Sequence, residues 1–178
     1  MKTTNFFIEL LVIGIGAVFC LVSALYLKIG DQLLEFLQKL DHPILILPLT
    51  AITYVLGIVF DRLFDALVNW KDSKIRKGAE LSKEEYNIVR SKYYDESDAV
   101  KQVFDYTKSR IRITRAWMFY FFILFIAFMI FAIISKSGHR GLLSFVCLLL
   151  SWLTYFAWQK LTISFNGQLK SMNNILSK

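Results

Sequence analysis

Four long apolar runs divide the chain, and polar segments separate them. The runs extend from Phe6 to Leu27, from Pro43 to Phe60, from Trp117 to Ile134 and from Leu142 to Ile163. About 20 apolar residues in a helix cross a hydrocarbon layer that is ~30 Å thick. Lipid leaves no backbone polar group hydrated, so helices are the expected spanning structure. The pattern therefore predicts an all-α, polytopic membrane protein with four transmembrane helices.

The polar segment between the second and third runs also has helical spacing. Leu63, Leu67 and Trp70 recur on one side of its first part, with charged residues on the other side. Gly78 is suited to end this helix, and Ser82 with Glu85 has the spacing of a capping box that begins another. We therefore expect the second and third transmembrane helices to extend into a cytoplasmic helical projection.

These patterns divide the chain into four parts. Residues 1–60 form a first transmembrane hairpin, whose outer connection is expected to hold an interfacial helix because its leucines share one face. Residues 61–116 form the cytoplasmic helical projection, residues 117–163 a second transmembrane hairpin, and residues 164–178 a cytoplasmic tail.

Basic residues are concentrated in the predicted projection. The chain carries 21 Lys and Arg, a net charge of +7 and 56% hydrophobic residues. The segment from Asp61 to Ala116 holds most of the basic residues, whereas Lys28, Lys39, Lys136 and Arg140 lie in the two opposite connections. The positive-inside rule places both termini and the projection in the cytoplasm. This asymmetry also explains the net charge without nucleic acid.

Ionisable residues lie at the inner ends of three predicted spans. Glu9 is about one turn inside the first, and Asp61 and Asp65 share a face at the end of the second. Arg110, Arg112 and Arg115 immediately precede the third. Charges at membrane depth are costly and usually paired. We expect Arg115 to face Glu9, and Asp61 or Asp65 to meet Arg112. Such pairs form either a structural lock or a switch between two states, and the sequence does not distinguish the two.

Two surfaces are candidates for packing and docking. Gly16, Cys20 and Ala24 recur every four residues and give the first helix a smooth stripe for close helix contact, within the bundle or between protomers of a homo-oligomer. A basic and aromatic set in the projection is a candidate surface for a cytoplasmic protein partner; its members are Lys71, Lys74, Arg76, Lys77, Tyr86, Arg90 and Tyr93. The same projection contains many Asp and Glu, which argues against direct nucleic-acid binding.

The sequence offers little for catalysis. His42 and His139 lie in separate connections, without cysteine or carboxylate at ligand spacing on their own helix. The glycines in VIGIGAV lie within an expected span, not at a strand-to-helix turn, so a phosphate-binding loop is not indicated. We expect no enzymatic activity, metal or cofactor.

The segment RIRITRAW, from Arg110 to Trp117, together with four spans and a helical inner connection, resembles small membrane proteins of bacterial anti-phage defence operons, such as the membrane subunit of the Kiwa system. The resemblance implies an inner-membrane oligomer that senses phage-induced disturbance and holds a cytoplasmic effector subunit. A related resemblance is to CRISPR-associated membrane accessory proteins of similar size and span number.

The expected function is therefore that of a sensor or scaffold that oligomerises in the inner membrane and docks a cytoplasmic effector. The alternative is a pore-forming effector that depolarises the cell when it is triggered. Thr50, Thr53 and Tyr54 share one face of the second helix and are its candidate polar lining.

Overall fold

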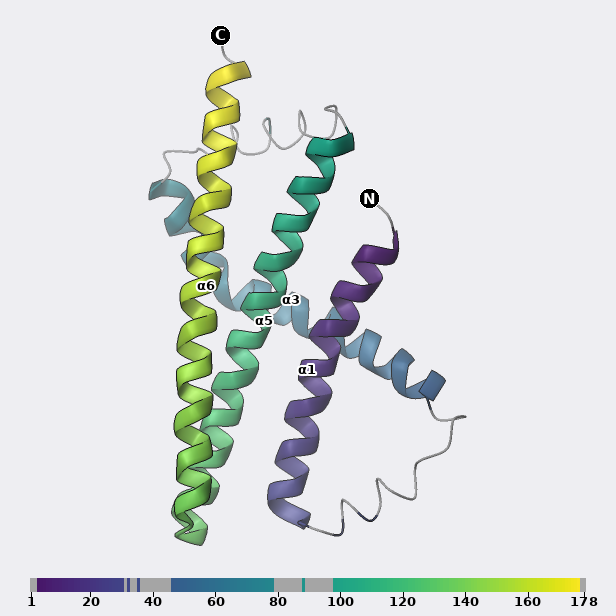
Figure 1. Cartoon of the computed structure of the whole chain (residues 1–178), viewed down its shortest axis with the longest axis vertical. Helices are drawn as coiled ribbons and strands as arrows, with labels where there is room; N and C mark the ends of the chain where they lie inside the picture. Colours follow the sequence, from purple (N-terminus) through teal and green to yellow (C-terminus); the bar gives the residue numbers. More distant parts are fainter. Residues whose placement is uncertain are drawn as a thin grey trace.

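The described part of the chain is entirely helical. The computed structural model describes residues 3–30, 46–78 and 98–176, together with Gln32, Glu35 and Ile88. These residues form α1 (Thr3–Ile29), α3 (Ile46–Gly78), α5 (Asp98–Ser135) and α6 (Gly138–Leu176) (Figure 1). Each of these four helices is long and apolar enough to cross a membrane, which confirms the prediction at this level. The expected interfacial helix and the helix beginning near Ser82 lie outside the described residues.

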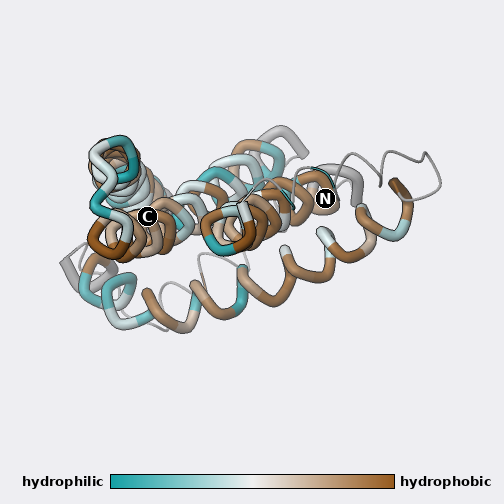
Figure 2. The backbone as a smooth tube through the Cα atoms, turned by 90° about the horizontal axis from the view of Figure 1, so that it is seen from below, coloured by the Kyte–Doolittle hydropathy of each residue, from teal (hydrophilic) through white to brown (hydrophobic). Residues whose placement is uncertain are grey.

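Three of the helices run roughly alongside one another, and α3 crosses them. Figure 1 shows the beginning of α1, the beginning of α5 and the end of α6 at the same end of the molecule. The turn between α5 and α6 lies at the opposite end, where α1 also finishes. Figure 2 shows α3 stretched across one side of the other helices. The helix that was predicted to extend into the cytoplasmic projection, α3, thus lies across the other helices.

The α5 and α6 helices form a long antiparallel hairpin. Their connection is short, with Lys136 in a left-handed conformation (φ 51°) before α6 begins at Gly138. Two serines of α6 donate hydrogen bonds to backbone carbonyls of α5: Ser144 to Phe125 and Ser151 to Met118, each at 3.1 Å. Small hydroxyl residues of this kind allow close helix packing in an apolar surrounding.

The fourth helix does not stop where its apolar run stops. It passes Ile163 and continues to Leu176. Phe165 and Leu169 are buried in this extension, and the Phe165 ring lies 5.0 Å from the ring of Phe104 on α5. The expected boundary at residue 163 thus falls inside one continuous helix, as do those at residues 60 and 116. These boundaries mark changes in composition and not breaks in the helices.

The core lies where α1, α3 and α5 meet, and Tyr120 is its central side chain. Tyr120 is 1% exposed, and its ring centroid lies 5.2 Å from that of Phe64 and 5.8 Å from that of Phe60. The α1 side of this core includes Ile13, Ala17 and Cys20.

Glycines allow close contact between α1 and α3. A Cβ at Gly14 would lie 1.8 Å from the carbonyl oxygen of Thr53, and a Cβ at Gly57 would lie 2.0 Å from that of Leu10. Both contacts are with backbone, so neither helix could accept a side chain without moving. The absence of a Cβ at Gly14 and Gly57 is what permits α3 to cross α1 at this short distance.

The predicted small-residue stripe is only partly used for packing. A Cβ at Gly16 would lie 2.4 Å from the Tyr120 ring, and Cys20 is buried with its Sγ 3.6 Å from the Tyr120 carbonyl oxygen. Ala24 is exposed. Gly16 and Cys20 therefore pack on α5 within the same chain, and the stripe does not extend to Ala24.

Candidate functional site

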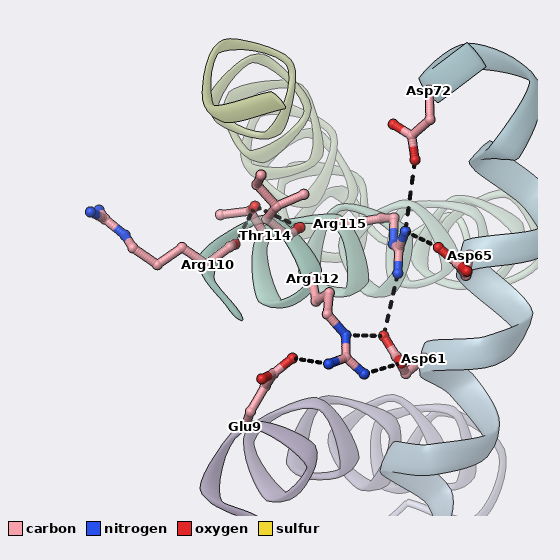
Figure 3. Close-up of polar contacts among 9 residues, drawn as sticks. Glu9, Asp61, Asp65, Asp72, Arg110, Arg112, Thr114 and Arg115 are labelled. Atoms are coloured by element: carbon pink, nitrogen blue, oxygen red, sulfur yellow. Dashed lines mark hydrogen bonds and ion pairs between the residues drawn. The ribbon is translucent and has the colours of Figure 1, made fainter. Parts of the chain in front are cut away.

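Charged side chains from three helices meet at one place in the structure. We call this group the arginine–carboxylate cluster; its members are Glu9 of α1, Asp61, Asp65 and Asp72 of α3, and Arg112 and Arg115 of α5. Figure 3 shows the two guanidiniums lying between the acidic side of α3 and Glu9. The spacing of the three aspartates, at i, i+4 and i+11, places them on one face of α3.

Arg112 connects α1 to α3. Its Nη2 and Nε donate to the two carboxylate oxygens of Asp61, at 2.6 and 3.3 Å. Its Nη1 lies 3.0 Å from Oε1 of Glu9, and its Cζ lies 5.2 Å from the centroid of the Phe6 ring. The two-pronged contact with Asp61 is the geometry in which guanidinium and carboxylate bind most strongly.

Arg115 contacts three carboxylates of α3. Its Nη2 lies 3.3 Å from Asp61, and its Nη1 lies 2.5 Å from Asp65 and 4.0 Å from Asp72. Asp61 and Asp72 are three turns apart on α3, and Figure 3 shows Arg115 between them. One arginine can meet both because α3 crosses α5 instead of running beside it.

Burial differs sharply among the members of the cluster. The side chains of Glu9, Asp61 and Arg115 are at most 5% exposed, whereas that of Asp65 is 58% exposed. A buried charge is costly unless it is paired, and removing one partner leaves the other uncompensated. Asp61 and Arg115 therefore form the buried centre of the cluster, and Asp65 forms its accessible edge.

Carboxylates outnumber guanidiniums in the cluster. Four acidic side chains meet two arginines. A single unit of charge added or removed here changes the local balance at low dielectric, where electrostatic interactions are strong. The arrangement can thus hold three helices together and can also respond to a change in charge.

The observed pairs differ from the expected ones in one respect. The contact of Asp61 with Arg112 is present, but Glu9 meets Arg112 and not Arg115. The reason is the path of α3, whose acidic face occupies Arg115 and leaves Arg112 as the arginine beside α1. Arg110 lies outside the cluster: it is exposed, and its Cζ lies 5.4 Å from the centroid of the Tyr106 ring. Figure 3 shows its side chain pointing away.

Asp72 belongs to the cluster, although sequence reasoning did not place it there. Its helical spacing from Asp61 and Asp65 was the available signal. A second contact that was not foreseen joins α3 to α6: Lys71 donates a short hydrogen bond to the hydroxyl of Tyr155, and its Nζ lies 4.2 Å from the centroid of that ring.

Only part of the expected docking surface can be placed. Besides Lys71, Lys74 is exposed, and its Nζ lies 5.3 Å from the centroid of the Trp70 ring. Arg76 and Lys77 lie in the last turn of α3. Tyr86, Arg90 and Tyr93 lie outside the described residues.

The described residues offer no other chemical centre. Among them, no group of three or more His, Cys, Asp or Glu is placed to hold a metal ion. A groove of about 300 Å³ between α5 and α6 is lined by Met118, Phe119, Phe122, Leu148, Ser151, Trp152 and Tyr155. Its serine hydroxyl already bonds to the Met118 carbonyl. The groove suits an apolar chain.

Comparison of the chain with protein-family models, with curated proteins and with solved structures gives no match.

Proposed function

We propose that this protein is a non-enzymatic sensor or scaffold of the bacterial inner membrane, with both termini in the cytoplasm. Four apolar helices of sufficient length support insertion. The beginnings of α1 and α5 and the end of α6 lie at one end of the molecule, so one orientation puts these ends on the same side of a membrane. The excess of Lys and Arg before the third span favours the cytoplasm as that side.

The arginine–carboxylate cluster is the observation that carries this proposal. It joins α1, α3 and α5 through buried ion pairs, at the level where the apolar part of α5 begins. A disturbance that tilts or separates these helices changes the same few contacts at the cytoplasmic side. Tightly packed charge networks of this kind have discrete arrangements, which is what a sensor requires.

The role in anti-phage defence, the homo-oligomer and the cytoplasmic effector rest on the resemblance carried by RIRITRAW. Two of its arginines, Arg112 and Arg115, are the cationic members of the cluster. Since Gly16 and Cys20 already pack on Tyr120 of the same chain, the contact between protomers uses another surface.

The arrangement of hydroxyl groups favours the sensor over the alternative of a pore. Thr50 and Thr53 bond to carbonyls of their own helix, at 2.7 and 2.8 Å. Ser144 and Ser151 bond to α5. These hydroxyl groups are therefore already bonded within the described protomer, and Thr53 is buried, whereas a water-filled lining requires exposed polar groups.

The test is phage challenge of cells that carry the protein with its neighbouring genes, comparing the wild type with Asp61→Asn. We expect Asp61→Asn to abolish protection even when its expression is adjusted so that the membrane fraction holds as much of it as of the wild type. Arg110→Gln, which changes an arginine outside the cluster, is the matched control and should protect as well as the wild type. Affinity purification in mild detergent should yield a stoichiometric cytoplasmic partner with the wild type and the control.

Two results would overturn the proposal. Full protection by Asp61→Asn, at the same amount of protein as the wild type, would show that the cluster takes no part in signalling. Purification of a homo-oligomer without a partner, together with loss of membrane potential when phage attack, would establish the pore instead.

A further inference from the structure

The second half of α3 lies at a nearly constant level relative to α5 and α6. Asp61 and Asp72 both reach Arg115, and Lys71 reaches Tyr155. Tyr155 of α6 lies at about the level of Arg115 of α5. Ser151 is one helical turn from Tyr155 toward the α5–α6 turn, and it donates a hydrogen bond to Met118, which is about one turn from Arg115 in the same direction. About 16 Å of α3 is thus laid across the hairpin at the height of Arg115.

This height is the boundary between the polar and apolar parts of α5. On the side of the chain ends lie Asp105, Lys108 and Arg110. On the side of the hairpin turn, large apolar side chains are exposed, beginning with Phe122 and Ile123. In the proposed membrane orientation, the second half of α3 therefore runs along the inner face of the bilayer.

The sides of α3 differ in a way that matches such a position. Phe60 and Phe64 point toward the hairpin turn, since their rings contact Tyr120 and Phe119. Arg62 and Asn69 are exposed and lie on the opposite side of the helix by helical spacing. The first side meets hydrocarbon, and the second meets water and headgroups.

Between these two sides, a large apolar stripe faces away from the other helices. Leu63 is 49% exposed, Leu67 is 53% exposed and Trp70 is 62% exposed. The stripe ends at exposed Lys74, whose ammonium lies over the Trp70 ring. Tryptophan beside lysine is a typical anchor at the membrane interface, where the ring sits among headgroups and the cation meets phosphate.

From these positions we propose that residues 61–74 of α3 form an interfacial helix that binds the anionic surface of the inner leaflet. Leu63, Leu67 and Trp70 enter the boundary between headgroups and acyl chains, and Arg62 and Lys74 contact anionic phosphates. The proposal rests on the proposed membrane orientation. It takes this part of α3 out of the cytoplasmic projection that the sequence predicted.

Charge complementarity selects lipid as the occupant of the stripe. The acidic side chains Asp61, Asp65 and Asp72 are directed to Arg112 and Arg115, so the exposed surface around the stripe retains the cations Arg62 and Lys74. Basic residues near an anionic lipid surface are attracted to it. One side of α3 thus binds lipid while its other side holds the cluster, so a change in the inner leaflet acts directly on the buried ion pairs.

Spin-label accessibility in lipid nanodiscs tests this placement. Single cysteines replace Leu63, Leu67, Trp70 or Asn69 in a chain with Cys20→Ala and Cys147→Ala, reconstituted in phosphatidylethanolamine and phosphatidylglycerol. We expect labels at positions 63, 67 and 70 to collide several-fold more with oxygen than with a water-soluble nickel chelate. The label at position 69 should show the opposite preference.

Labels at Ile130→Cys and Leu149→Cys replace exposed apolar residues of α5 and α6. They distinguish failure of the interfacial-helix proposal from failure of the membrane assignment. If these report lipid while positions 63, 67 and 70 report water, the interfacial helix is wrong and the membrane assignment stands. If all report water, the membrane assignment fails. Exclusion of both reagents at positions 63, 67 and 70 would indicate a second copy or a protein partner on the stripe, and would overturn the proposal.

A change of lipid charge tests whether residues 61–74 prefer an anionic membrane surface. Replacing phosphatidylglycerol by phosphatidylcholine should lower the ratio of oxygen to nickel collisions at position 67. Arg62→Glu combined with Lys74→Glu should remove that dependence. An unchanged ratio in both lipids would overturn the charge contribution.

Discussion

Asp61 and Arg115 contact each other at 3.3 Å with only 5% of either side chain exposed. Asp61 also accepts two hydrogen bonds from Arg112, so one carboxylate holds two guanidiniums of the same helix. Arg112 also contacts Glu9 of α1. A single buried acid thus stands at the centre of the ion pairs that link three helices.

Asp61→Asn should strongly destabilise the protein. The change keeps the shape of the side chain but leaves Arg112 and Arg115 without their central counterion. Loss of one partner from a buried ion pair costs about 3–5 kcal/mol. Asp65→Asn is the matched control, because an exposed pair contributes only about 0–1 kcal/mol. Unfolding in a fixed detergent, followed by circular dichroism, measures both, and equal losses would contradict the assignment of Asp61 as the centre.

Glu9 should be energetically coupled to Arg112 and not to Arg115. Double-mutant cycles with Glu9→Gln, combined with Arg112→Gln or Arg115→Gln, isolate the two pair interactions. Contacting residues show coupling energies of about 0.5–3 kcal/mol. We expect a value in that range for Glu9 with Arg112 and a clearly smaller one for Glu9 with Arg115. Similar couplings for both pairs would show that the cluster acts as one unit.

The helices and five of the six members of the cluster could be predicted from the sequence, because both depend on local patterns; Asp72 was missed, and the expected member Arg110 lies outside the cluster. Apolar runs give the spans, and the cost of burying charge brings Glu9, Asp61, Asp65, Arg112 and Arg115 together once their levels are known. The partner of Glu9 was not predictable in the same way. It depends on the angle at which α3 crosses α5, and hydrophobic spacing within each helix does not specify that angle.

The crossing itself depends on contacts between residues far apart in the sequence. Gly14 and Gly57 permit the short distance between α1 and α3, but a glycine in an apolar run does not reveal which helix it meets. The extension of α6 was missed for a related reason. Polar residues follow Ile163, and only the burial of Phe165 and Leu169, with the Phe165 ring against Phe104 of α5, shows why the helix continues.

Alanine at the glycines of the α1–α3 contact should be poorly tolerated. The added methyl of Gly14→Ala or Gly57→Ala would overlap a backbone carbonyl, at 1.8 or 2.0 Å, so the helices must separate. Overpacking of this kind costs about 1–3 kcal/mol. Gly167→Ala is the control: nothing lies within 4 Å of its Cβ, and removing a helical glycine should stabilise by about 0.5–1 kcal/mol. Unfolding midpoints in one detergent would order the three variants.

The hydroxyl of Tyr120 should contribute nothing to stability, although its ring is central to the core. Tyr120 is 1% exposed, and its hydroxyl has no hydrogen-bond partner among the described residues. A buried hydroxyl without a partner has lost its hydration, so removing it is neutral or stabilising by up to about 2 kcal/mol. Tyr120→Phe should therefore raise the unfolding midpoint or leave it unchanged.

Tyr120→Ala should instead cost about 3–5 kcal/mol, because it leaves a cavity between Phe60, Phe64 and Trp117. The pair of variants separates the ring from its hydroxyl in a single denaturation experiment. A loss of about 1–3 kcal/mol in Tyr120→Phe would show that a buried water or another polar group satisfies the hydroxyl.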